Sequence, residues 1–137
     1  MELNLASALA NRLFTEHSLQ GWRFRFDFAR KRFGRCEYTQ KRIQLSAPMT
    51  LANSEEQVRN VILHEIAHAL VGPKQYHNEV WRAKAQSIGC TGNIYYNEDG
   101  AQRIEGRFEG TCPNCNRTIK RHKRSRISCG ICCKKFN

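Results

Sequence analysis

The stretch VILHEIAHALV, residues 61–71, decides the fold of this chain, because it has the composition of a helix and clear ends. Ser54 and Gln57 precede it with the spacing of a helix capping box. Gly72-Pro73 follows it, and such a pair stops a helix. The sequence therefore predicts one helix between Ser54 and Gly72, with HEIAH near its centre.

Two histidines of this helix lie on one side of it. Residues four apart lie only about 40° apart around the helix axis, so His64 and His68 project together. Roughly the same side carries Gln57, Asn60 and Val61. The opposite face is the natural core face and carries Val58, Ile62, Ile66 and Ala69. We therefore expect the histidines to face a cleft.

Glu65 lies about 100° round the axis from His64, beside a metal held there without being forced to bind it. Neutral imidazoles hold Zn²⁺ and leave a coordination position for water. The metal lowers the pKa of that water and polarises a substrate carbonyl, and a neighbouring carboxylate can take the proton and pass it to the leaving amine. HEIAH therefore predicts a catalytic zinc with Glu65 as general base, in preference to an inert helix.

Two histidines do not complete a zinc site, and His77 is the best candidate for a third ligand. It follows the Gly-Pro turn and begins a second amphipathic segment, HNEVWRAKAQSIG. This segment could pack on the metal helix through Val80, Trp81, Ala85 and Ile88. Glu79 and the more distant Glu98 remain alternatives as carboxylate ligands.

The first fifty residues predict a helix followed by a small antiparallel sheet. Leu5, Leu9 and Leu13 recur every four residues, which indicates an amphipathic helix over residues 3–17. WRFRFDF, residues 22–28, alternates four aromatic rings with charged residues, as a half-buried strand does. We expect these rings to be core and not a stacking platform for bases. Further strands are expected at 34–39 and 41–47.

The end of the chain has the cysteine spacing of a zinc ribbon. Cys112, Cys115, Cys129 and Cys132 form two CxxC pairs separated by thirteen residues. Four thiolates make a closed structural site, and metal binding supplies the folding free energy that so small a core lacks. Cys133 is an alternative to Cys132, although the CxxC spacing favours Cys132. Disulfides are the less favoured alternative, and Cys36 and Cys90 are expected to be small buried residues.

The positive charge of the chain lies mainly at its end. The net charge is +11 and the pI about 9.7, which suggests an anionic partner such as nucleic acid or a membrane surface. Residues 1–102 carry a net +3 and residues 103–137 a net +8, of which four thiolates and one Zn²⁺ would leave about +6. The run between the CxxC pairs is expected to contact DNA phosphates: Arg117, Lys120, Arg121, Lys123, Arg124 and Arg126. A solvated charged face is the alternative.

The compartment is expected to be intracellular, either cytoplasmic and nucleoid-associated or nuclear. The start of the chain lacks the basic and apolar regions of a signal peptide, so secretion is not expected. No apolar run is long enough to span a bilayer, so a membrane role is not expected. Paired cysteines in a reducing compartment bind metal more often than each other.

The chain resembles the SprT-like (Spartan-type) zinc metallopeptidases with a C-terminal zinc ribbon. The resemblance rests on HEIAH, on His77 with eight residues between it and His68, on Trp81 four residues later and on the following ribbon. The upstream FGRCEYTQKRIQLSAPM, residues 33–49, is similar to the sheet region of that family. Relatives commonly have Gly after the third histidine, where this chain has Asn78.

The resemblance implies metal-dependent cleavage of DNA-bound proteins, including covalent DNA–protein crosslinks. By position it makes His64, His68 and His77 ligands and Glu65 the general base. It assigns no residue to the oxyanion, for which Tyr76 and Tyr38 are candidates. We expect an α+β, zincin-like catalytic domain over residues 1–102 and a basic ribbon over 103–137.

The expected protein is a monomer with two Zn²⁺, one catalytic and one structural. Its expected partners are DNA-bound protein substrates and DNA, single-stranded or partly single-stranded and without sequence preference. The alternatives are a non-catalytic nucleic-acid-binding protein with a structural HEIAH metal, and a metallopeptidase with an incidental basic tail.

Overall fold

The structure, a computed structural model, describes residues 1–124, 126 and 128–132. It forms two compact units, a first unit of Met1–Arg103 and a second unit of Ile104–Asn137. Cys133 and Phe136 lie outside the described residues. None of the described helices is long and apolar enough to cross a membrane.

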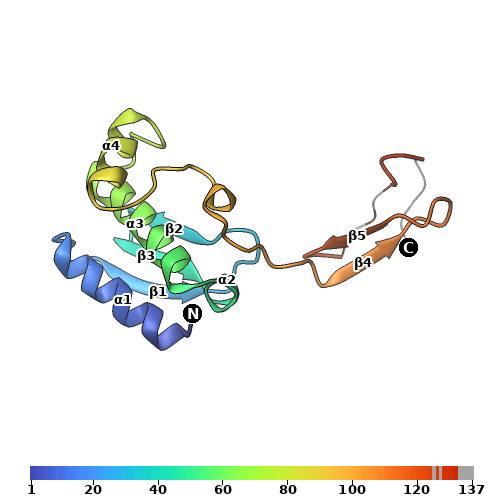
Figure 1. The fold of residues 1–137 in the computed structure, drawn as a ribbon, viewed down its shortest axis with the longest axis horizontal. Helices are drawn as coiled ribbons and strands as arrows, with labels where there is room; N and C mark the ends of the chain where they lie inside the picture. The colour runs from blue at the N-terminus through green and yellow to red at the C-terminus, as the bar shows by residue number, and fades with distance from the viewer. Residues whose placement is uncertain (125, 127, 133–137) are drawn as a thin grey trace. The chain divides into compact units, whose positions relative to one another are not determined.

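The first unit mixes helices with a small sheet (Figure 1). Its elements are α1 (Leu3–Glu16), β1 (Arg23–Asp27), β2 (Gly34–Glu37), β3 (Arg42–Ser46), α2 (Ala47–Ala52), α3 (Glu55–Val71), α4 (Glu79–Ser87) and the 3₁₀ turn η1 (Tyr96–Asp99). The α+β class is confirmed. The helix α2 was not expected, although its signals are local: Pro48 stands in its first turn and Ser46 caps it by accepting from the Met49 amide at 3.2 Å.

The three-stranded sheet is mixed, so the prediction of an antiparallel sheet was wrong for one pair. The strand order is β1-β3-β2. β2 and β3 form an antiparallel hairpin, whereas β1 runs parallel to β3. The chain reverses once between β1 and β2 and again in the hairpin, so β1 and β3 point the same way. Alternation within a strand predicts its faces but not its neighbour, which is why the sequence left this pairing open.

The core of the first unit lies between the helices and one face of the sheet. The sheet contributes Ile43 and Leu45, α1 contributes Leu13, and α3 contributes Ile62 and Ile66, all fully buried. At about 25 cal/mol per Å² of apolar surface, each such side chain stabilises the fold by about 1.5–3 kcal/mol. This core fixes the position of α3.

Several predicted core residues are more exposed than expected. Trp22, Phe24 and Phe26 are only half-buried, so they lie at the edge of the core, where Phe24 packs edge-on against Phe14 of α1 at 6.4 Å. Phe28, however, lies beyond the end of the strand and is 83% exposed. Leu5 and Val80, both 54% exposed, also lie outside the core.

The second unit contains an antiparallel hairpin, β4 (Phe108–Thr111) and β5 (Thr118–Arg121). Asn116 turns the chain between the strands with a φ of 58°, a left-handed conformation that asparagine tolerates. The Cys112 amide donates to the Arg117 carbonyl at 2.8 Å and closes the turn. The hairpin therefore holds the first CxxC pair in a tight loop.

Candidate functional site

The helix α3 carries the first two candidate ligands and is well anchored at both ends. Ser54 caps its start by accepting from the Gln57 amide at 3.4 Å. Gly72, with a φ of 89°, ends it, and the Tyr38 hydroxyl donates to the His68 carbonyl there at 3.2 Å. The Tyr38 hydroxyl therefore secures the helix end, which argues against its role as oxyanion donor.

The expectation that the histidines face a cleft is confirmed, because His64, His68 and His77 line a cavity, but the rest of this side of α3 is more covered than expected. Residues 61–67 are buried all round the helix, and His64 is 2% exposed. Ala69, expected in the core, is half-buried. The histidine side is covered because α4 and the segment after it pack over it, which periodicity within α3 cannot reveal.

His77 reaches the pair on α3 from a short turn before α4. Its neighbour Asn78 is the helix cap and accepts from the Trp81 amide at 3.1 Å. Asn78 therefore performs a capping role at the position where relatives commonly have Gly. The Nε2 atom of His77 lies 3.1 Å from that of His64 and 3.0 Å from that of His68.

Trp81 fixes the orientation of all three imidazoles. It is fully buried, and its ring lies 4.6, 5.2 and 4.7 Å from those of His64, His68 and His77. Its indole N–H donates to the His64 carbonyl at 3.4 Å. The three ring nitrogens are therefore held together by packing as well as by backbone geometry.

The three nitrogens fit a zinc ion. A tetrahedral Zn²⁺ with Zn–N bonds of about 2.0–2.1 Å separates its nitrogens by about 3.3 Å, close to the separations seen here. Burial, with the neighbouring histidines, lowers the pKa of His64 to about 3 and that of His68 to about 4. Burial also lowers the pKa of His77. Three neutral imidazoles at neutral pH are the form that binds metal.

The carboxylate alternatives for the third ligand are not in this cluster. Among the described residues, the groups that could hold a metal are the three histidines and a set of four cysteines. The Glu79 side chain is 91% exposed and forms an ion pair with Arg82 at 3.7 Å. Glu98 is exposed on η1. The prediction that His77 joins the histidine pair, and these carboxylates do not, agrees with the structure.

Glu65 is buried under β2, where the sheet approaches α3 very closely. Only glycine fits at position 34 without displacing its neighbours, because a Cβ there would lie 2.9 Å from Glu65 Oε1 and 2.9 Å from Val61 Cγ1. Glu65 is 4% exposed. Burial raises its pKa to about 7, against the opposing effects of a Tyr96 hydrogen bond and the Arg32 charge. A carboxyl with a pKa near neutrality suits proton transfer in both directions.

Tyr96 was missed by the sequence analysis, although it makes the shortest side-chain contact to Glu65. Its hydroxyl donates to Glu65 Oε1 at 2.6 Å, and its ring lies 5.1 Å from that of His64 and 5.7 Å from that of Phe33. Burial, with the Glu65 charge, raises the pKa of Tyr96 well above its usual value, so the hydroxyl keeps its proton. It is therefore a donor fixed on one carboxylate oxygen.

Asp99 holds the segment that carries Tyr96 against α3. Its backbone carbonyl accepts from Gln57 Nε2, and its Oδ2 accepts from Asn60 Nδ2 at 3.1 Å. Its Oδ1 accepts from Asn93 Nδ2 at 3.0 Å, and Thr91 Oγ1 donates to Oδ2 at 3.0 Å. Gln57 and Asn60 lie on the histidine side of α3. Their polar side chains were the feature of the sequence that could have predicted a polar segment packed over this side of the helix.

The histidines and Glu65 border a cavity of about 520 Å³ within the first unit. Tyr76, a predicted oxyanion candidate, lines it and is 77% exposed. Cys36 also lines the cavity and is half-buried, so the expectation of a buried cysteine holds for Cys90, 5% exposed, and not for Cys36. Burial, with the Glu65 charge, raises the pKa of Cys36 to about 12 and keeps it a thiol.

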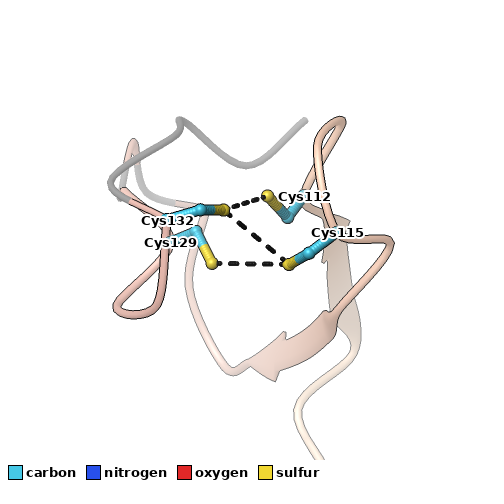
Figure 2. Close-up of side chains that lie close together, drawn as sticks. All are labelled: Cys112, Cys115, Cys129 and Cys132. Atoms are coloured by element: carbon cyan, nitrogen blue, oxygen red, sulfur yellow. Dashed lines mark hydrogen bonds between the residues drawn. The ribbon is translucent and has the colours of Figure 1, made fainter.

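The predicted ribbon cysteines come together in the second unit (Figure 2). Cys132 Sγ lies 3.2 Å from that of Cys112 and 3.8 Å from that of Cys115, and the Cys115 and Cys129 sulfurs are 3.8 Å apart. A tetrahedral Zn²⁺ with Zn–S bonds of about 2.3 Å separates its sulfurs by about 3.8 Å. All four are free, so the cluster fits zinc and not disulfides. Backbone N–H groups of Cys132 and Ile131 lower the pKa of Cys129 to about 6.

The predicted phosphate contacts lie just before, on and after β5. All six are exposed: Arg117, Lys120, Arg121, Lys123, Arg124 and Arg126. Lys120 forms an ion pair with Glu105. Lys120 and Arg121 lie on β5, whereas Lys123, Arg124 and Arg126 follow it, and contact of these cations with nucleic acid stays a prediction.

The fold and the histidine cluster together define a class, the metallopeptidase fold. Jannalysin of Methanocaldococcus jannaschii, solved as a metallopeptidase zymogen, is similar with a TM-score of 0.55 at 13% identity, over 63% of this chain and 83% of that one. Abylysin of Pyrococcus abyssi, also a metallopeptidase zymogen, has a TM-score of 0.52 at 19% identity, over 61% and 78%. A comparison with curated protein sequences finds no match.

Residues 3–103 match the SprT-like family, and the chain belongs to that family. The match spans the sheet, α3 with its two histidines, His77 and the segment that carries Tyr96. The family resemblance of the sequence is thus confirmed for the first unit.

Proposed function

We propose that this protein is a zinc metalloendopeptidase that cuts proteins held on DNA, including proteins crosslinked to it. The observation that carries the catalytic part is Glu65, a buried carboxylate next to the three imidazoles with a tyrosine hydroxyl on one of its oxygens. A structural zinc site needs no such carboxylate, because four ligands alone close it.

Each residue of the site has a defined part in this proposal. His64, His68 and His77 hold the zinc through their Nε2 atoms. The bound metal supplies Lewis acidity, which polarises a peptide carbonyl and lowers the pKa of water. Trp81 keeps the imidazoles in place, and the cavity of about 520 Å³ receives the peptide.

Glu65 moves the proton. The Tyr96 hydroxyl occupies Oε1, which leaves Oε2 to accept a proton from water and later to donate it to the leaving amine. Burial favours the neutral carboxyl, and the Tyr96 hydrogen bond favours the carboxylate, so the two effects hold the pKa near neutrality. Both protonation states are thus accessible during one turnover.

The positive charge of the second unit is the reason to propose DNA as a partner. Residues 103–137 carry a net +8, and six exposed cations lie in the chain between the two cysteine pairs, on and around β5. Fixed cations bind a phosphate backbone without reading its sequence. A DNA tether raises the local concentration of a DNA-bound protein at the cavity, so substrate choice needs no deep side-chain pocket. We propose one zinc in each unit.

A second candidate function is a non-catalytic DNA-binding protein with a structural metal in the first unit. The exposed cations of the second unit favour DNA binding in either case. The two candidates differ in what Glu65 does, and this difference can be tested directly.

The test replaces Glu65 with Gln, which has nearly the same shape and cannot take a proton. We expect Glu65→Gln to keep its zinc content and melting temperature but to lose cleavage of an unstructured protein by about 10²–10⁴-fold. The zinc content per chain is measured by elemental mass spectrometry, and cleavage is measured by gel electrophoresis. Unchanged cleavage in this variant would exclude the proposed mechanism and favour the structural metal.

A further inference from the structure

The three-stranded sheet has one face that the helices do not cover. On the covered face, Phe24 contacts Phe14 of α1, and Gly34 approaches Val61 of α3. Register places Ile43 beside Phe24 on that same face. Side chains of a strand alternate between faces, so the residues between these point the other way. The open face carries Arg23, Arg25 and Asp27 of β1, Arg35 and Glu37 of β2, and Arg42, Gln44 and Ser46 of β3.

The arginines of the open face lie in two rows across the strands, next to a third row formed by Asp27 and Ser46. One row is Arg23, Arg42 and Glu37, in register on β1, β3 and β2. The next row is Arg25, Gln44 and Arg35. Neighbouring strands lie about 4.8 Å apart, so the two rows bring four guanidinium groups onto one small surface. We call these four residues, Arg23, Arg25, Arg35 and Arg42, the arginine face.

Such an arrangement costs stability unless an anion covers it. Like charges directly opposite each other on a sheet are destabilising, and Arg23 lies opposite Arg42. Glu37 compensates Arg42 alone, through an ion pair at 2.8 Å. Across residues 1–124, 126 and 128–132, no ion pair is formed by Arg23, Arg25 or Arg35. Three exposed guanidinium groups therefore remain for an external anion.

The charge of the first unit is concentrated in this region. Residues 23–42 hold eight Lys and Arg against two acidic residues, a net +6. The remainder of residues 1–102 holds five against eight, a net −3. The modest +3 of residues 1–102 therefore conceals a strongly basic segment, residues 23–42, which contains the arginine face, within an otherwise acidic unit.

The basic surface continues toward the cavity. The loop after β1 carries Lys31 and Arg32, both exposed, and both line the cavity beside Glu65. Arg32 pairs with Asp27 at 2.8 Å, which holds the loop against the end of β1. β2 itself has Cys36 on the cavity side and Arg35 on the open face. A ligand on the arginine face would thus lie on the back of a strand that borders the metal site.

We propose that the arginine face binds the sugar–phosphate backbone of nucleic acid, as a contact site on the first unit separate from the cations of the second. Guanidinium groups form bidentate hydrogen bonds with phosphate, and arginine suits this role better than lysine. The face has no aromatic side chain, because the rings of β1 point into the core, so it binds phosphate and does not stack bases. It also lacks the apolar anchors on which protein–protein interfaces depend, which disfavours a folded acidic protein as its ligand.

The test measures DNA affinity against salt concentration in full-length protein. All proteins carry Glu65→Gln, so the result does not depend on proteolysis and is separable from the failure of the proposed activity. One variant replaces Arg23, Arg25 and Arg35 with Gln. A matched control replaces Arg12, Arg59 and Lys84, exposed cations of α1, α3 and α4, and removes the same charge. Fluorescence anisotropy of a labelled oligonucleotide, single-stranded or duplex, reports binding.

The arginine-face variant should flatten the slope of log affinity against log salt. Each phosphate contact adds about 0.9 to the magnitude of this slope for duplex DNA and about 0.7 for single strands. Loss of three contacts should therefore reduce the magnitude of the slope by up to about 2.7 for duplex and about 2.1 for single strands. The control should change the slope by much less. Substitution of the same three residues by Lys should keep most of the slope, and this variant shows that the effect is one of charge.

Three results would overturn the proposal. The first is an equal slope in the arginine-face variant and the control. The second is an equal fall in the Lys and Gln variants, since a charge contact would survive in Lys. The third is displacement of the labelled oligonucleotide from the protein with its arginine face intact by polyglutamate, added at the same concentration of negative charge as the oligonucleotide. That result would assign the face to an acidic protein.

Discussion

At the scale of single residues, the proposed mechanism depends on how one carboxylate, Glu65, is held. Glu65 is packed under Gly34, and the Tyr96 hydroxyl holds its Oε1. A larger residue at position 34 would have to displace the carboxylate, because a Cβ there would lie 2.9 Å from Oε1. Packing from one side and a hydrogen bond from the other thus leave Glu65 few orientations. Such restraint is what a general base needs in order to act at a fixed position.

Tyr96→Phe should lower the rate of cleavage without removing the metal. The variant keeps the ring packing against His64 and loses only the hydrogen bond to Glu65. A hydrogen bond to a charged group contributes about 1.5–3 kcal/mol, which corresponds to about a 10–100-fold lower kcat. Steady-state kinetics on an unstructured protein measure this loss, with zinc content as the control.

A comparison of double variants separates positioning from general damage. If Tyr96 acts through Glu65, Tyr96→Phe should cause no further loss in a Glu65→Gln protein. If the two losses multiply, Tyr96 contributes to the structure independently and the positioning role is wrong. The melting temperature of each variant shows whether the fold has changed.

At the scale of elements, the segment from Thr91 to Ala101 packs over α3 and encloses the side of the helix that carries the histidines and Glu65. It has little regular structure beyond η1, and Asp99 ties it to α3 through Gln57 and Asn60. In the proposed mechanism the helix supplies two metal ligands and the base, and this segment supplies the Tyr96 hydroxyl that binds the base. Its position depends on hydrogen bonds more than on apolar packing, so it should be the part of the site most sensitive to loss of one polar residue.

Asp99→Ala should release this segment and reduce cleavage about as much as Tyr96→Phe does. The substitution removes the carboxylate oxygens that accept from Asn60, Thr91 and Asn93. Hydrogen exchange measured by mass spectrometry should become faster over residues 91–101, while α3 stays protected. Glu98→Ala, an exposed carboxylate of the same 3₁₀ turn, is the matched control and should change neither. Equal exchange in the two variants would contradict this role of Asp99.

The same contrast between elements explains what the sequence could predict. α3 was predictable because its ends, its histidine spacing and its core face are all local properties. His77 was predictable because a turn and a helix start place it close to α3 in the chain. The cysteine pairs were predictable because their spacing is itself the signature of a metal site.

What the sequence could not predict depends on contacts between distant segments. The parallel pairing of β1 and β3 skips a strand, and no periodicity within a strand encodes its partner. Tyr96 reaches Glu65 across 31 positions through an irregular segment that has no helical or strand period. Phe28 continues the alternation of β1 beyond the point where the strand ends, so pattern alone placed it in the core.

At the scale of the whole molecule, the chain combines a unit of the SprT-like family with a small basic unit that brings four cysteines together. The first unit matches the SprT-like family over residues 3–103, and its histidines and Glu65 border a cavity of about 520 Å³. The second unit is too small to fold on apolar burial alone, and its cysteine cluster supplies the missing stability when metal binds. In the proposed function, substrate choice then depends on location on DNA more than on peptide sequence.

Neutralisation of the hairpin cations should separate DNA-directed cleavage from cleavage itself. The variant replaces Lys120, Arg121, Lys123 and Arg124 with Gln, all exposed residues of the second unit. We expect it to lose the stimulation by DNA of cleavage of a DNA-bound protein, because the tether no longer raises local concentration. Its DNA affinity should depend less on salt, with the log–log slope flatter by up to about three to four units.

Cleavage of a free unstructured protein by this variant should be nearly unchanged, because the residues that carry the chemistry lie in the first unit. The assay is therefore paired, with proteolysis measured with and without DNA for the variant and the unaltered protein. If both are stimulated equally by DNA, the hairpin cations are a solvated surface and not the tether. If the arginine face alone supported that stimulation, the arginine-face variant would lose the stimulation instead. The same paired assay on both variants therefore assigns the tether to the first unit, to the second unit, or to both.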